Sequence, residues 1–240
     1  MAGVISAFRN ITSDRLWIIK VAVFSIPLFM YFHDKKAVLS VFVHDYIFFM
    51  ALGLFYLGIS SVLINRNINN KMPILPFIFD IYEIIIKTIG SVLATLPSLI
   101  IVCYILYFVE HVVHLDNDNV ENIIKICTAV LMFPFICMPV VVFSARGNIL
   151  DVFKSFKIFF YCGRFIEHFL GYIIYSVITI GLAAYLIYTG LEQYVGVERI
   201  YVQILYSFLI TLYVLMLFSC ASDLYGDVIP EIEEKGKSIR

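Results

Sequence analysis

Six long runs of apolar residues fill most of the chain, and they constrain the fold more than any other feature of the sequence. A helix that crosses the hydrocarbon core of a bilayer, about 30 Å thick, needs about 20 mostly apolar residues. The six runs cover Trp17 to Phe32, Tyr46 to Ile64, Ile89 to Phe108, Ile123 to Phe143, Phe169 to Tyr188, and Ile200 to Ala221. The sequence therefore predicts an all-α, polytopic helical membrane protein with six transmembrane helices.

The composition agrees with a membrane environment. Hydrophobic residues make up 62% of the chain and charged residues 15%, against roughly 45–50% and about 25% in soluble domains. The connections between the runs are too short for a second, soluble domain, so residues 1–240 are predicted to form a single integral membrane domain. The first run ends in Tyr31, Phe32 and His33 and not in small residues suited to cleavage, so we expect no signal-peptide processing.

The Lys and Arg residues sort to one side of the predicted spans. Most of them lie on the side of the N terminus: Arg9, Arg15, Lys20, Arg66, Lys71, Lys87, Arg146, Lys154, Lys157, Arg164, Lys235, Lys237 and Arg240. The other side has Lys35, Lys36, Lys125 and Arg199. By the positive-inside rule, both termini are predicted to be cytoplasmic and the protein to lie in the cell membrane as a multi-pass chain. Basic residues spread along a membrane face, without a soluble basic patch, argue against nucleic-acid binding.

Three segments that precede outward-going spans have the period of an amphipathic helix. Their apolar stripes are Val4, Ile5 and Phe8; Phe77, Ile78, Ile81, Ile84 and Ile85; and Ile149, Val152, Phe153, Phe156 and Phe160. Their polar faces carry Ser6, Arg9 and Asn10; Asp80, Glu83 and Lys87; and Asp151, Lys154 and Ser155. The pattern predicts a unit of interfacial helix plus transmembrane hairpin, used three times. The alternative is that any basic, apolar linker on the cytoplasmic face looks amphipathic.

Such segments are predicted to contact membrane lipids at the cytoplasmic interface. Phenylalanine side chains enter the acyl region there, and basic side chains attract anionic headgroups. The residues expected at the lipid interface are Arg9, Lys87, Phe153, Lys154, Phe156, Lys157 and Arg164. The partners expected of this chain are therefore membrane lipids, with a protein partner in the membrane as a second class.

Several polar residues near the ends of the runs have a predicted local role. The helix of the first run is expected to begin nearer Ser13, so that Lys20 reaches the headgroups. Glu83 and Lys87 are four residues apart, which favours an ion pair between them. Gly226, between two aspartates, is expected to cap the last helix, the alternative being a cation or partner contact by the aspartates. The cysteines at 103, 127, 137, 162 and 220 are predicted to be buried and to pack as small hydrophobic side chains.

The stretch Gly58 to Leu96 contains the polar turn Asn65-Arg66-Asn67, then Met72-Pro73-Ile74-Leu75-Pro76 and an acidic amphipathic segment. A later stretch reads Phe143-Ser144-Ala145-Arg146-Gly147-Asn148, followed by Val152-Phe153. In these motifs the chain resembles an uncharacterised prokaryotic family of six-span membrane proteins, known only as a domain of unknown function. The resemblance implies the same architecture and a prokaryotic plasma membrane, and it brings no activity.

The sharpest polar cluster is Glu110, His111 and His114, at the outer end of the third run. Residues three and four apart share a helix face, and imidazole with carboxylate suits zinc or another divalent ion. A metal site would need a further ligand, for which His44 and Asp45 are the nearest candidates. The favoured interpretation is a solvated polar helix end, so no metal and no cofactor are predicted.

Prolines interrupt three of the runs, at Pro27, Pro97, Pro134 and Pro139. Two of them lie in the fourth run, which makes it the best candidate for a kinked helix beside a substrate path. The chain has no P-loop, zinc-protease, nucleophile-elbow or dinucleotide motif. The sequence therefore predicts a non-enzymatic membrane-embedded scaffold or accessory subunit that binds lipid or a partner protein. A transporter or channel subunit is the alternative, and an intramembrane enzyme comes third.

Overall fold

The computed structural model describes residues 4–34, 42–70, 74–112, 138–150 and 199–237, together with scattered single positions between 124 and 189. The elements are α1 (Val4–Thr12), α2 (Trp17–Asp34), α3 (Phe42–Asn70), the short 3-10 helix η1 (Ile78–Asp80), α4 (Ile81–Val112) and α9 (Arg199–Lys237). Residues 138–146 are also helical. Over these residues the fold is all-α, as the apolar runs predict.

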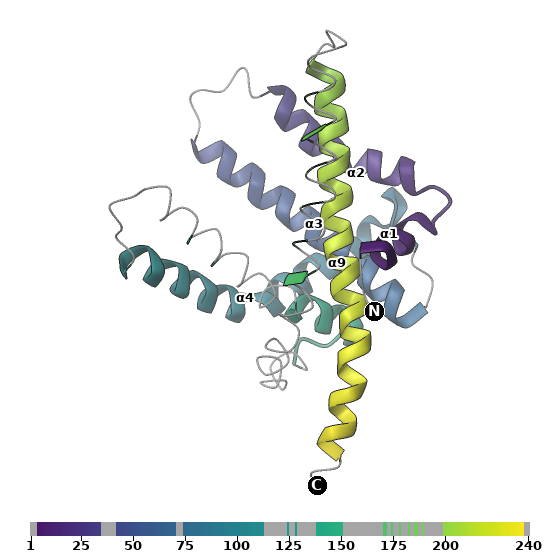
Figure 1. Ribbon diagram of the computed structural model, residues 1–240, viewed down its shortest axis with the longest axis vertical. Helices are drawn as coiled ribbons and strands as arrows, with labels where there is room; N and C mark the ends of the chain where they lie inside the picture. Colours follow the sequence, from purple (N-terminus) through teal and green to yellow (C-terminus); the bar gives the residue numbers. More distant parts are fainter. Residues whose placement is uncertain are drawn as a thin grey trace.

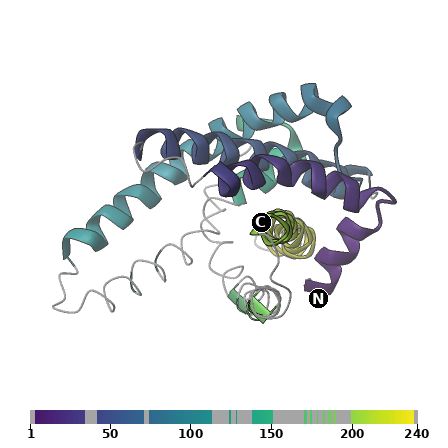
Figure 2. The ribbon, with the colours of Figure 1, turned by 90° about the horizontal axis from the view of Figure 1, so that it is seen from above.

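α9 is the axis of the described bundle. It is the long vertical helix of Figure 1 and contacts α1, α2 and α3. α4 packs against α3 and runs away from α9 (Figure 1). Figure 2, which looks nearly along α9, shows α2, α3 and α4 on one side of it. The first and last parts of the chain therefore lie side by side.

Three of the described helices are long and apolar enough to cross a membrane. The qualifying segments are Ala51–Asn69 of α3, Ile81–Val109 of α4 and Ile200–Asp223 of α9, which correspond to the second, third and sixth predicted runs. The apolar part of α2, Trp17–Tyr31, is shorter. The fourth and fifth runs lie mostly outside the described residues.

The membrane-length helices differ in how much of them is covered. Half of the segment in α3 and half of that in α9 is buried, against 17% of that in α4. The uncovered side of α4 carries large apolar side chains, which in water would leave a costly apolar surface exposed. α3 and α9 thus form the interior of the bundle, whereas α4 presents an apolar outer face.

α2 begins later in the chain than predicted. The helix begins at Trp17 and not nearer Ser13, because residues 13–16 form a turn. Within that turn a carboxylate oxygen of Asp14 accepts the backbone N–H of Leu16 at 2.9 Å. Local hydrogen bonds of this kind compete with regular helix, so α1 and α2 remain two separate helices.

The structure also corrects the prediction of a separate interfacial helix before the third run. This concerns the segment from Ile81 to Lys87. It forms the first turns of α4, and no break separates it from the membrane-length part of that helix. The bend lies before it, at η1, where Asp80 accepts the backbone N–H of Phe77 at 2.8 Å. The first two predicted repeat units are therefore built differently, since α1 stands apart from α2. The third unit lies mostly outside the described residues.

Residues that often break helices lie inside three of the described helices. α2 continues through Pro27, and α4 continues through Pro97. α9 passes through Gly226 and ends at Lys237, so the predicted cap at Gly226 is wrong. At 1.5 Å per residue a 39-residue helix is about 58 Å long, far more than the roughly 30 Å of a bilayer core. The C-terminal part of α9 extends beyond the rest of the bundle (Figure 1).

α3 and α4 approach each other closely at Gly58. A Cβ atom added there would lie 2.0 Å from Oγ1 of Thr88 and 3.1 Å from the backbone oxygen of Ile84. Small residues let membrane helices pack at such short range. The absence of a side chain at Gly58 therefore sets the distance between α3 and α4.

We expect Gly58→Leu to lower the free energy of unfolding by about 1–3 kcal/mol, because the new side chain overpacks this contact. Unfolding in mild detergent, followed by circular dichroism, measures the change. Gly53→Leu is the matched control: it lies in the same helix, and no heavy atom comes within 4 Å of a Cβ placed there. Equal stability of the two variants would contradict the close packing.

Candidate functional site

Polar side chains gather at one end of the bundle, which we call the polar end. It is the end where α1, the start of α2 and the end of α3 contact α9, and where the start of α4 contacts the end of α3. Hydrogen bonds there join Asn10 and Asn67 to Asp223, and Lys20 to Leu75. The polar end therefore ties together segments that are far apart in the sequence.

The first group at the polar end, the Asp223 cluster, consists of Ser6, Asn10, Asn67, Ser219, Ser222 and Asp223. Ser6 Oγ donates to Oδ2 of Asp223 at 2.7 Å, and Asn10 Nδ2 donates to both carboxylate oxygens at 3.0 and 3.1 Å. Asn67 Nδ2 donates to Oδ1 at 3.1 Å. The same two amides also contact the hydroxyls of Ser219 and Ser222, at 3.3 and 3.0 Å. Hydrogen bonds to a charged acceptor are among the strong ones, so this carboxylate holds α1 and α3 against α9.

α1 is an amphipathic helix as predicted, and two of its polar side chains point into the bundle. The polar side chains Ser6 and Asn10 point into the bundle, toward Asp223, together with the buried residues Ala7 and Ile11. Ile5, predicted for the apolar stripe, is 85% exposed. The pattern predicted the helix correctly and did not identify Asp223 as the partner of its polar side chains.

The second group is a buried ion pair between α2 and the turn before it. Lys20 Nζ lies 2.7 Å from Oδ2 of Asp14 and donates to the backbone oxygen of Leu75 at 2.7 Å. The same carboxylate oxygen accepts the N–H of Leu75 at 3.0 Å. Both charged side chains are buried, so the predicted extension of Lys20 to headgroups is wrong. A cation this deep needs an anion, and Asp14 supplies it.

The surroundings of Asp14 favour its charged form. Burial would raise the pKa of Asp14, but hydrogen bonds from Lys20 and from the backbone of Leu16 and Leu75, with the positive charge of Lys20, outweigh burial and hold the pKa below its ordinary value. Asp14 therefore stays ionised at neutral pH. The pair fixes the loop before η1 to the start of α2.

The third group centres on Arg66 of α3. Its guanidinium lies 2.6 Å from Glu83 and 3.2 Å from Asp80, and it contacts the backbone oxygen of Ile74 at 3.5 Å. Arg66 thus takes the place that Lys87 was expected to fill beside Glu83. Lys87 Nζ lies instead 5.4 Å from the centre of the Phe143 ring, a distance suited to a cation–π contact.

A buried serine group lies deeper between the helices. Ser61 Oγ of α3 is 2.5 Å from the hydroxyl of Ser144 and accepts the hydroxyl of Ser91 at 3.0 Å. These three side chains are fully buried, and they join α3 to α4 and to residues 138–146. Interhelical hydrogen bonds between hydroxyls are a usual means of holding membrane helices together. The group is a structural contact with no charged or strongly nucleophilic member.

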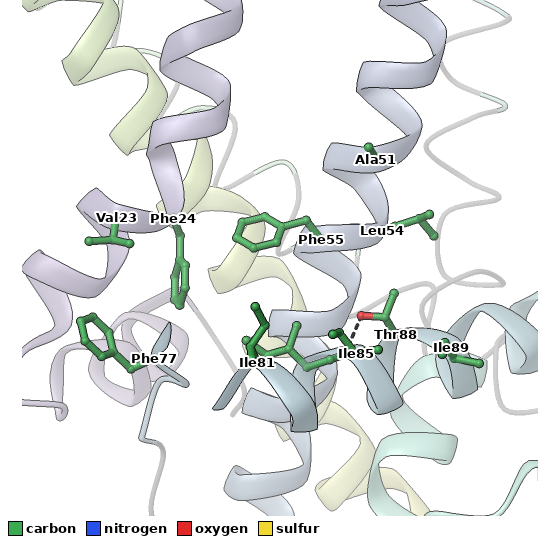
Figure 3. Close-up of a pocket in the computed structure, with 11 residues that line it drawn as sticks. Val23, Phe24, Ala51, Leu54, Phe55, Phe77, Ile81, Ile85, Thr88 and Ile89 are labelled. Carbon is green, nitrogen blue, oxygen red and sulfur yellow. Dashed lines mark hydrogen bonds between the residues drawn. The ribbon is translucent and has the colours of Figure 1, made fainter. Parts of the chain in front are cut away.

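An apolar cavity of about 390 Å³ opens between α2, α3 and the start of α4. It is lined by Val23, Phe24, Ala51, Leu54, Phe55, Phe77, Ile81, Ile84, Ile85, Thr88 and Ile89. Figure 3 shows Phe24 and Phe55 beside the space, with Ile81 and Ile85 below them. The Thr88 hydroxyl, which is the polar side-chain group of the lining, is turned back to the oxygen of Ile84 at 2.6 Å. We call this cavity the apolar groove.

The predicted site residues are described only in part. Arg9 is exposed on α1, and Lys87 lies over Phe143. The expected lipid contacts at Phe153, Lys154, Phe156, Lys157 and Arg164 lie outside the described residues, as do Pro134 and most of the predicted kinked fourth span. The lipid-interface role of all these positions stays a prediction.

His111 is exposed in the last turn of α4. Its Nδ1 lies 3.1 Å from the oxygen of Tyr107, and the two rings are 4.0 Å apart. The side chain of Glu110 and the whole of His114 are outside the described residues. Among the side chains that are described, no three His, Cys, Asp or Glu come together as metal ligands. Of the described cysteines, Cys220 is buried as expected, but Cys103 is exposed on α4.

The sequence did not single out Asn67 or the role of Asp223. The available signal was the position of the polar residues in the sequence. Asn67 and Asp223 lie near the ends of the two apolar segments of α3 and α9, and these two helices pack together. Two polar residues at the same depth on neighbouring helices are candidates for a contact. No protein family, curated protein or solved structure matches the chain. The likeness to the six-span prokaryotic family therefore stays a prediction.

Proposed function

We propose that the protein is a multi-pass scaffold or accessory subunit of the prokaryotic cell membrane, with six spans and no enzymatic role, which binds lipid or a partner protein. The observation that carries the proposal is the set of three membrane-length helices, one of which presents an apolar outer face. A face of this kind suits lipid or the apolar surface of another membrane protein. The polar end would then lie at the cytoplasmic interface.

The contacts of the charged groups support a scaffold. Asp14, Lys20, Arg66 and Glu83 are all engaged with one another or with the backbone at the polar end. Such contacts use the ionisable groups to join helix ends, and they fix the relative positions of the helices. A rigid polar end with an apolar outer face is what a membrane scaffold needs. Extraction of native membranes with alkaline carbonate tests membrane integration, and release of the protein into the supernatant would reject it.

The orientation follows from the charge bias, which places both termini and the loop after α3 in the cytoplasm. We expect cysteines at Asn69 and Gly236 to be protected from an impermeant thiol reagent in intact cells, and a cysteine at Asn117 to be labelled. Lysed cells provide the control, in which all three should react. Labelling of the first two positions in intact cells, or protection of Asn117→Cys, would reverse or reject the topology.

A further inference from the structure

We propose that the apolar groove binds one acyl chain of a membrane lipid. This inference rests on the proposed function, because it needs α2, α3 and α4 to lie in a bilayer. The side chains of the lining carry no charge, and the Thr88 hydroxyl is already bonded to the backbone. A ligand with polar groups would lose its hydration there without gaining hydrogen-bond partners. The lining therefore fits an apolar chain.

The groove opens onto the outer face of α4. Ile81, Ile85 and Ile89, which follow one another at a spacing of four residues, are 60%, 51% and 57% exposed. The same stripe continues along α4 through the exposed residues Leu93, Leu96 and Ile100. Phe24 and Ile84, in contrast, are almost fully buried in the groove wall. A chain that lies along the stripe can thus enter from the lipid side and reach the core.

The rings on the wall give the groove a fixed shape. Phe24 of α2 and Phe55 of α3 meet edge to face, with their centres 6.0 Å apart. In a bilayer the hydrophobic effect does not distinguish lipid from protein, so the affinity comes from van der Waals contact and from filling space that would otherwise be void. A preformed groove of this size gains both when a flexible chain fills it.

The pairing of the cations beside the groove indicates which part of a lipid it would bind. Two cations beside the groove are paired within the protein. Lys20, 6.0 Å from the ring of the lining residue Phe77, is paired with Asp14. Arg66 is likewise paired with Asp80 and Glu83. Neither cation is available to an anionic headgroup. The groove should therefore recognise the acyl chain, with little dependence on headgroup charge.

The test uses the full-length protein, taken from nanodiscs of phosphatidylcholine or of phosphatidylglycerol into mild detergent. Native mass spectrometry then measures the fraction that retains one lipid. We expect retention from both lipids, and a decrease of about tenfold in Ala51→Phe, whose ring fills the groove. Gly53→Phe is the matched control: it lies two residues away on α3, outside the lining and in open space, and it should retain lipid as the wild type does.

A second pair of variants tests the groove from the side of α4, so that the result does not depend on Ala51→Phe folding. Ile85→Trp should lower retention, whereas Leu93→Trp, which is exposed beyond the lining, should not. Equal retention in all variants, or retention from phosphatidylglycerol alone, would overturn the proposal. So would cross-linking of a second protein to a photoreactive residue placed at Ile89, an exposed position of the lining. Carbonate extraction tests membrane integration separately. A protein that stays in the membrane but does not retain lipid in the groove would therefore contradict this inference and leave the proposed function standing.

Discussion

Lys20→Met is expected to lower the free energy of unfolding by about 3–5 kcal/mol, because it leaves the Asp14 carboxylate buried without its cation. The substitution keeps most of the side-chain volume, so the loss reports the charge and not a cavity. It also removes the hydrogen bond to the oxygen of Leu75. Denaturant unfolding in mild detergent measures the difference. A loss below about 1 kcal/mol, the usual value for exposed pairs, would show that the pair is solvated.

The double variant Lys20→Met, Asp14→Asn is the control for this result. Asparagine at position 14 carries no charge and keeps one acceptor oxygen, which can accept the N–H of Leu16 or that of Leu75 but not both, so part of the stability should return. The wild type should lose the contribution of the pair on acidification. Because the pKa of Asp14 is lowered on folding, its contribution is complete above the unfolded value of about 3.9 and is lost as the pH falls through the folded pKa. Asp14→Asn should remove this part of the acid sensitivity.

The length and composition of apolar runs predicted α3, α4 and α9, because a membrane helix must satisfy its backbone internally and cover about 30 Å with apolar side chains. The same information did not predict the contacts of Lys20. Extension of a lysine to headgroups and burial against an aspartate are both compatible with a cation near the end of a span. Which of these two positions Lys20 takes depends on Leu75, whose backbone oxygen is close to Lys20 only in the folded chain.

The amphipathic pattern of α1 predicts a helix but does not determine which of its faces points into the bundle. An amphipathic helix on a membrane protein can turn its apolar face to lipid and its polar face to the protein, the reverse of a helix on a soluble core. Ser6 and Asn10 point inward because Asp223 is there to accept their hydrogen bonds. That acceptor lies more than 200 residues away in the sequence. The sequence also predicts that the last helix ends close to Asp223, at Gly226, whereas α9 continues to Lys237.

Asp223→Ala is expected to release α1 from α9. The substitution removes the acceptor shared by Ser6, Asn10 and Asn67, and each hydrogen bond to a charged group contributes about 1.5–3 kcal/mol, although the three do not add in full. The contacts that remain on α1 include the hydrogen bond from Asn10 to Ser219, the burial of Ala7 and Ile11, and the edge contact between Phe8 and Trp17. A nine-residue helix is too short to be stable in water without its contacts.

The measurement is thiol labelling of Ala7→Cys in a background whose native cysteines are replaced by alanine. Ala7 is fully buried, so its cysteine should react slowly in the wild type and at least about tenfold faster in Asp223→Ala, since a loss of 1.4 kcal/mol in the closed state corresponds to that factor. Arg9→Cys, at an exposed polar position of the same helix, should react fast in both. Asp223→Asn keeps an acceptor, and Ser6→Ala removes one hydrogen bond of the cluster, so both should give intermediate rates. Continued protection of Ala7→Cys in Asp223→Ala would mean that apolar burial alone holds α1, and that the carboxylate serves another purpose.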